Sequence, residues 1–138
     1  MKKQWLIRIM IVASLGSPVL AEVRLPTLFS DNMVLQQGVP IPIWGWGQLN
    51  EQVTVRFGSQ TVSASTRENG KWILHLAPMP ASNQPMDMII EGKANTITIK
   101  NIFVGEVWLA SGQSNMVQQL GRTFGGEELL KRSLTQIR

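Results

Sequence analysis

Short segments in which apolar and polar residues alternate run from residue 22 to about residue 102. Successive side chains of an extended strand point to opposite faces, so this period predicts strands with one buried face. In residues 53–57, for example, Val53, Val55 and Phe57 share a face. Asn69-Gly70 is the strongest hairpin signal, because both residues readily adopt positive φ. We therefore predict a mainly β chain, with a β-sandwich over residues 22–101.

The composition limits what can hold such a fold together. The chain has 138 residues and no cysteine, which excludes disulfides and thiolate metal sites. Its single histidine, His75, also argues against a metal site built from several histidines. We therefore expect core packing to stabilise the fold, without a metal or a cofactor. The tryptophans are predicted to belong to this core: Trp44, Trp46, Trp72 and Trp108.

The first residues have the pattern of a secretory signal peptide. Lys2, Lys3 and Arg8 accompany a short apolar stretch at residues 9–15, and Ala21 ends a segment typical of a cleavage site. The apolar stretch is shorter than the roughly 20 residues of a membrane-spanning helix, so we expect no stable membrane anchor. Residues 1–21 are thus predicted to be removed, with the protein exported to the periplasm or out of the cell.

Removal of residues 1–21 changes the charge balance. These residues contain three of the 13 Lys and Arg and none of the nine Asp and Glu, so the net charge falls from +4 to +1. No basic patch characteristic of nucleic-acid or lipid binding is left. We accordingly expect no nucleic-acid partner.

The pattern changes near residue 102. Residues 102–110 form a nearly continuous apolar run, which is typical of a strand covered on both faces in an α/β sheet. Residues 126–134 carry acidic residues early and basic residues late, as a helix dipole favours. Residues 102–138 are therefore predicted to be the first strand and helix of an incomplete α/β domain.

Ser114 follows the predicted strand within the sequence Ser-Gly-Gln-Ser-Asn. Ligands of open α/β sheets bind beyond the carboxyl ends of strands, and free N–H groups of a following helix would suit an oxyanion. Gln113 and Asn115 add polar groups on either side. An ordinary strand-to-helix turn whose serine caps the helix has the same pattern. The residues alone leave both interpretations open.

Three separated stretches resemble the amino-terminal part of the sialate O-acetylesterase family, a branch of the SGNH (GDSL-like) hydrolases. They are LFSDNMVLQQ at residues 28–37, PIWGWG at residues 42–47 with the strand and Gly-Lys-Trp that follow, and VGEVWLASGQSNM at residues 104–116. The resemblance covers nearly all of residues 23–138. It departs from the family pattern at Leu49-Asn50-Glu51, where Pro-Gly-Glu is usual, and at Val117-Gln118.

The resemblance implies a serine carboxylic-ester hydrolase acting on acetylated sugars, such as 9-O-acetyl sialic acid. It implies that Ser114 is the nucleophile and that its backbone N–H is one oxyanion donor, with Gln113 and Asn115 near the substrate. It also implies a β-sandwich before the SGNH domain. The family's remaining oxyanion donors and its Asp-x-x-His block belong to later parts of the pattern than this chain contains. We therefore expect an N-terminal fragment that is inactive alone.

His75 is not predicted to be the catalytic base. It lies in residues 72–76 on the face opposite Trp72, Leu74 and Leu76, as a surface histidine of a strand would. A general base must come within about 2.6–3.2 Å of the serine oxygen. The alternative to the esterase is a non-catalytic carbohydrate-binding or adhesive β-sandwich that retains the serine motif. The coding sequence beyond codon 138 would discriminate between the two.

Overall fold

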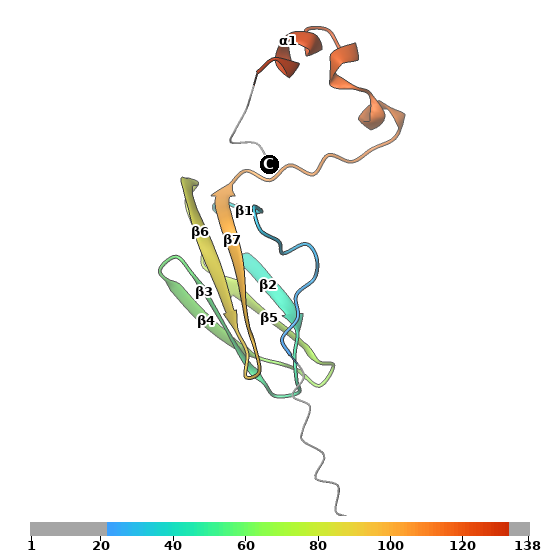
Figure 1. Cartoon of the computed structure of the whole chain (residues 1–138). Helices are drawn as coiled ribbons and strands as arrows, with labels where there is room; N and C mark the ends of the chain where they lie inside the picture. Colours follow the sequence, from blue (N-terminus) through green and yellow to red (C-terminus); the bar gives the residue numbers. More distant parts are fainter. Residues whose placement is uncertain (1–21, 133–138) are drawn as a thin grey trace, which may run out of the picture.

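The structure is a computed structural model that describes residues 22–132 (Figure 1). The predicted signal peptide lies outside these residues. The described part is mainly β, as predicted, and it contains one short α-helix. The elements are β1 (Val34–Gln36), β2 (Ile41–Trp46), β3 (Gln52–Phe57), β4 (Gln60–Ser65), β5 (Lys71–Leu76), β6 (Ser82–Glu91), β7 (Thr96–Gly105), the 3₁₀ helices η1 (Ser114–Val117) and η2 (Leu120–Arg122), and α1 (Gly126–Leu130).

The strands form two sheets. One has five strands in the order β1-β7-β6-β3-β4, and the other pairs β2 with β5. Adjacent strands run antiparallel except β1 and β7, which are parallel. The β3–β4 hairpin turns at Gly58, whose φ of 57° suits a residue without a side chain.

Asn69-Gly70 does not close a hairpin, which corrects the prediction. The turn connects β4 to β5, and these strands belong to different sheets. Gly70 does adopt a positive φ of 72°, and its N–H donates to the carbonyl of Arg67. The positive φ was therefore predicted correctly for Gly70, whereas Asn69 does not adopt it. The pairing was wrong because β4 pairs with β3 and β5 pairs with β2.

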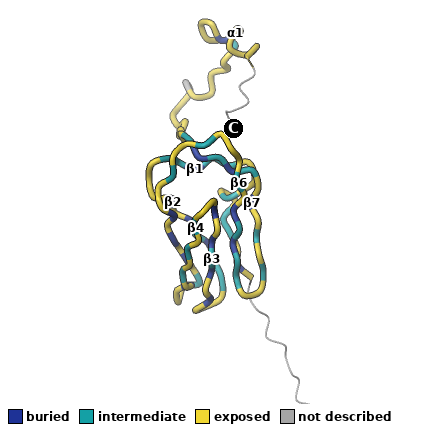
Figure 2. Tube along the Cα trace, turned by 90° about the vertical axis from the view of Figure 1, so that its left-hand side faces the viewer, coloured by how far each residue is buried: buried dark blue, intermediate teal, exposed yellow. Residues whose placement is uncertain are grey.

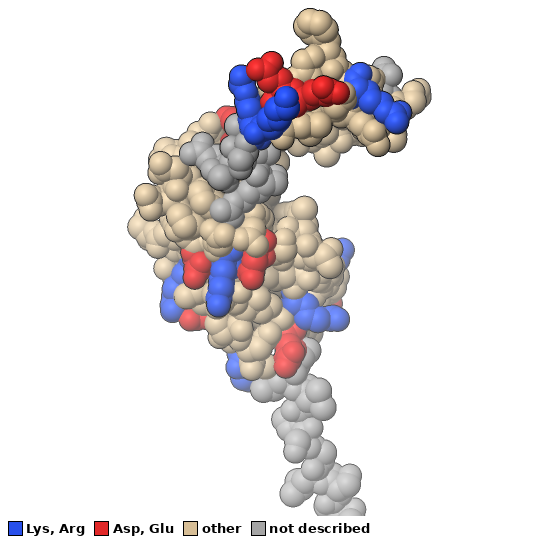
Figure 3. All heavy atoms as spheres, turned by 45° about the horizontal axis from the view of Figure 1, so that its top comes forward, with Lys and Arg blue, Asp and Glu red and all other residues tan. Residues whose placement is uncertain are grey.

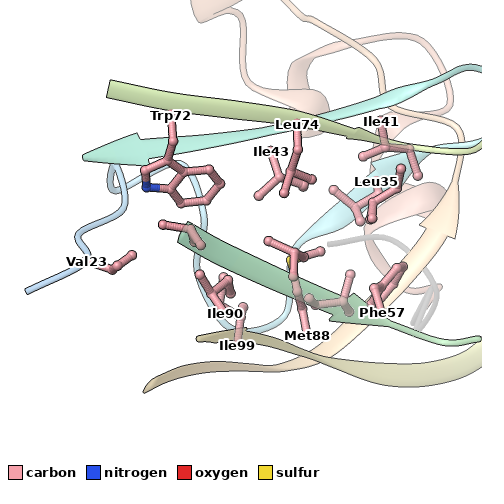
Figure 4. Close-up of a cluster of buried hydrophobic side chains, with 14 of the residues drawn as sticks. Val23, Leu35, Ile41, Ile43, Phe57, Trp72, Leu74, Met88, Ile90 and Ile99 are labelled. Carbon is pink, nitrogen blue, oxygen red and sulfur yellow. The ribbon is translucent and has the colours of Figure 1, made fainter. Parts of the chain in front are cut away.

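The two sheets enclose one hydrophobic core (Figure 4). Val53, Val55 and Phe57 of β3 point into it, as the alternation predicted. From the opposite sheet, β5 contributes Trp72 together with Leu74 and Leu76. The other buried apolar residues are Val23, Leu35, Ile41, Ile43, Met88, Ile90, Ile99, Ile102 and Val104.

The tryptophans differ in burial, so the prediction that all four belong to the core holds only in part. Trp72 is 1% exposed, and its Nε1 donates to the carbonyl of Trp46 over 3.4 Å. Trp44 is half-buried on the outer face of β2. Its ring lies edge-on to the ring of Phe29, with the two ring centroids 4.7 Å apart. Trp108 is 87% exposed and contributes nothing to this core.

The predicted strand at residues 102–110 is not a separate element. Residues 102–105 are the end of β7, where Ile102 and Val104 are buried on one face only. Residues 106–113 form no strand or helix and are exposed (Figure 2). The pairing of β7 ends at Gly105, because no strand of the described chain lies beside the residues that follow. The division into two domains at residue 102 stays a prediction.

The turn before β3 contains a buried carboxylate. Asn50 supplies the positive φ of 60° at the position where the family usually has glycine. Glu51 is only 7% exposed. Its Oε2 accepts the Gln48 N–H over 2.8 Å, and its Oε1 accepts the Lys93 N–H over 2.6 Å. The carboxylate therefore joins this turn to the β6–β7 turn.

Replacement Glu51→Gln is expected to lower the free energy of unfolding by about 1–3 kcal/mol. The amide would present an NH₂ group to one of the two backbone N–H groups, which would then lack an acceptor. Urea denaturation measures the change. Glu68→Gln in the exposed turn before β5 is the matched control and should have almost no effect. Equal losses in the two variants would contradict this role of Glu51.

Candidate active site around Ser114

Ser114 is exposed and is the first residue of η1. It does not directly follow a buried strand, because residues 106–113 separate it from β7. No long helix follows it either, since η1 is a four-residue 3₁₀ turn. The helix N-terminus that was predicted to supply oxyanion donors is therefore absent from the described residues. What the structure offers is an accessible hydroxyl on a tight turn.

The neighbours of Ser114 define that turn. The carbonyl of Gln113 accepts the N–H of Met116 over 3.0 Å, and the Gln113 side chain is exposed. Asn115 is the second residue of η1. At Gly112 a Cβ would lie 2.8 Å from the Cγ of Met116. The glycine thus lets the Met116 side chain fold back over the backbone just before Ser114.

His75 is exposed on β5, opposite Pro42 of β2, as predicted. It belongs to the two-stranded sheet, whereas Ser114 lies in the segment after β7 (Figure 1). Within residues 22–132, no hydrogen bond joins the side chain of Ser114 to a histidine or a carboxylate. His75 is the only histidine of the chain. No base is therefore hydrogen-bonded to Ser114 in the part of the chain that the structure describes.

Glu106 is the carboxylate nearest in sequence before Ser114, and it is exposed. Hydrogen bonds from the side chains of Gln37 and Gln36 lower the pKa of its carboxyl group, and slight desolvation opposes them. Because the folded-state pKa is lowered, these bonds stabilise the fold above the unfolded pKa. Their contribution is lost as the pH falls through the folded pKa.

The segment that carries Ser114 is largely exposed (Figure 2), and many of its exposed side chains are apolar. They are Val107, Trp108, Leu109, Met116, Val117, Leu120, Phe124, Leu129 and Leu130. Basic and acidic side chains are interspersed at its far end (Figure 3). Arg122, Lys131, Glu127 and Glu128 line an open hollow in this part of the chain.

No group of three or more His, Cys, Asp or Glu side chains within residues 22–132 could hold a metal ion. No helix in that part of the chain is long and apolar enough to cross a membrane.

Comparison with known proteins provides close relatives. No protein-family model matches the chain. Sialate O-acetylesterase of Mus musculus is 31% identical over 114 residues, which cover 74% of this chain and 21% of the relative. The Homo sapiens protein of the same name is 31% identical over 112 residues, covering 73% and 21%. A solved carbohydrate acetylesterase from Xanthomonas citri matches with a TM-score of 0.72 and 30% identity, over 79% of this chain and 25% of that one.

The fold and these relatives place the chain in a class of β-rich proteins related to carbohydrate esterases. Within that class, the chain belongs to the sialate O-acetylesterase family. It spans about a fifth of the length of the curated relatives that it matches.

Proposed function

We propose that the chain is the amino-terminal part of an exported carbohydrate O-acetylesterase and supplies its nucleophile, Ser114. The observation that carries the proposal is the likeness to sialate O-acetylesterases, together with an exposed Ser114 on the turn that ends the VGEVWLASGQSNM segment. Gln113 and Asn115, which flank Ser114, are assigned to the sugar side of the site. The substrate class is an acetyl ester on a sugar, with O-acetylated sialic acid as the first candidate.

The mechanism is acyl transfer through a covalent intermediate. The Oγ of Ser114 attacks the acetyl carbonyl while a histidine takes its proton. The tetrahedral intermediate collapses, the sugar oxygen leaves with that proton, and an acetyl-serine forms. Water then attacks the acetyl-serine, releasing acetate and restoring Ser114. Since His75 lies on β5, the imidazole has to come from outside residues 22–132.

A hybrid protein tests this function. Residues 22–132 replace the matching segment of the Xanthomonas citri carbohydrate acetylesterase, and acetate release from acetylated sugars is measured. The folded hybrid should release acetate, because the remaining part of the Xanthomonas citri enzyme supplies the base. The 138-residue chain alone should hydrolyse p-nitrophenyl acetate no faster than its Ser114→Ala variant.

The two measurements also address the alternative of a non-catalytic sugar-binding module. The lack of a base near Ser114 in the described residues is the observation that favours this alternative. A folded hybrid that binds acetylated sugar but releases no acetate would support it. Turnover by the 138-residue chain that depends on Ser114 would show instead that the base lies within this chain.

A further inference from the structure

Three polar side chains meet where the chain leaves the five-stranded sheet. Gln36 and Gln37 stand at the end of β1, and Glu106 directly follows β7. Gln36 Nε2 donates to Glu106 Oε2 over 3.1 Å, and Gln37 Nε2 donates to Glu106 Oε1 over 2.5 Å. Each carboxylate oxygen therefore accepts a hydrogen bond from a different glutamine. Hydrogen bonds to an ionised acceptor are stronger than those between neutral groups.

The same glutamines use their amide oxygens to hold backbone. Gln36 Oε1 accepts the N–H of Val107 over 2.9 Å, and Gln37 Oε1 accepts the N–H of Ala81 over 3.1 Å. The parallel β1–β7 ladder ends where Gln36 lies opposite Gly105. The Gln36 side chain thus adds one more hydrogen bond between the two segments after the backbone pairing has ended.

No other hydrogen bond attaches residues 106–112 to the sheets within the described part of the chain. These residues are exposed and lie between β7 and the turn that carries Ser114. The hydrogen bonds to Glu106 and Val107 are therefore the last ones that hold the chain to the sheet before it continues towards Ser114.

We propose that Gln36, Gln37 and Glu106 form a polar clamp that fixes the direction of the chain from the five-stranded sheet to Ser114. The two glutamines are then positioning residues for acyl transfer, acting through the 106–113 segment. A displacement of about 1 Å at a reacting group can cost about a hundredfold in rate, so the direction of this segment matters. The role of Ser114 rests on the proposed function, whereas the clamp itself is testable without any activity.

Amide hydrogen exchange of the 138-residue chain, followed by NMR, tests the clamp. Gln36→Met keeps the length of the side chain but removes the acceptor of the Val107 N–H. Exchange at Val107 should become about three to ten times faster, as expected for one lost hydrogen bond. Heteronuclear NOE values of residues 107–113 should fall as well. Gln52→Met, at the exposed start of β3, is the matched control and should change neither quantity.

A pH titration separates the clamp from general stabilisation. The side-chain amide resonances of Gln36 and Gln37 should shift in acid with a midpoint below that of an ordinary glutamate, since both glutamines favour the ionised Glu106. Glu106 forms no ion pair within the described residues. The charged groups of the strands packed beside it are Asp87, Glu91 and Lys100, nearer the opposite end of the β6–β7 ladder. In Glu106→Gln the titration should disappear.

Two results would overturn the clamp. One is Val107 exchange as slow in Gln36→Met as in Gln52→Met. The other is a titration of the glutamine amides that persists in Glu106→Gln. If Gln36→Met does not fold, Glu106→Gln decides, because its carboxylate is exposed and its replacement leaves the core intact. An inactive hybrid with an intact clamp would count against the esterase function alone.

Discussion

Replacement Trp72→Ala is expected to lower the free energy of unfolding of the 138-residue chain by about 3–5 kcal/mol. Trp72 is 1% exposed and fills the space between the two sheets (Figure 4). Truncation would leave a large cavity and would also remove the hydrogen bond from its Nε1 to the carbonyl of Trp46. Single domains are stable by only about 5–15 kcal/mol, so the loss is a large part of the total.

Trp108→Ala is the matched control, since it removes the same side chain from an exposed position. Its effect on the free energy of unfolding should stay within about 0.5 kcal/mol. Urea denaturation of both variants measures the difference. A loss at Trp108 as large as the loss at Trp72 would show that Trp108 is buried in solution, contrary to the structure.

Replacement Ser114→Ala in the hybrid enzyme is expected to reduce kcat for acetate release by about 10³- to 10⁶-fold. Losses near the upper figure follow removal of the nucleophile from a serine hydrolase, while binding and oxyanion contacts leave a residual rate. KM should change little, because the hydroxyl acts mainly in the transition state. Initial rates over a range of acetylated-sugar concentrations measure both constants.

Ser111→Ala is the control for this prediction. Ser111 is exposed, precedes Gly112 and lies outside η1, so its replacement tests whether any serine of the segment matters. The hybrid with Ser111→Ala should retain most of its kcat. Comparable losses for both variants would indicate disruption of the segment rather than removal of a nucleophile.

The direction of side chains along each strand was predictable, because alternation is a local property of extended backbone. Val53 and Phe57 of β3 are buried as their spacing indicated, and His75 on β5 is exposed as its phase indicated. The choice of partner strand was not predictable from Asn69-Gly70. A turn sequence specifies a local backbone conformation, whereas the pairing of β5 with β2 depends on residues distant in sequence.

The apolar run at residues 102–110 misled for a related reason. Ile102 and Val104 are buried on one face of β7, while Trp108 and Leu109 are exposed. Hydrophobicity alone does not reveal which residues have a neighbour to cover them. The prediction assumed that the whole run is buried and therefore assigned a strand covered on both faces. In the structure, residues 102–105 end a strand with one buried face, and the residues after them are exposed.

The site was predictable to a different degree for its different parts. Ser114 was singled out by a sequence motif and by resemblance, and the structure adds that it is exposed on η1. The contacts of Gln36 and Gln37 with Glu106 were missed, because they join residues about 70 positions apart. A signal did exist, since Glu106 interrupts an apolar run, where a buried carboxylate would need a partner. The structure places Glu106 at an exposed position, where the two glutamines bind it.

The measurement that tests the central claim most directly is the site of acetylation in the hybrid enzyme. The hybrid is mixed with an acetylated sugar and quenched in acid before the intermediate hydrolyses. Mass spectrometry of its peptides then locates any acetyl group. We predict one acetyl group on the peptide that contains Ser114, at Ser114 itself, and none in the Ser114→Ala variant. Acetate release with the acetyl group on another residue, or with none on Ser114 at any quench time, would contradict the account.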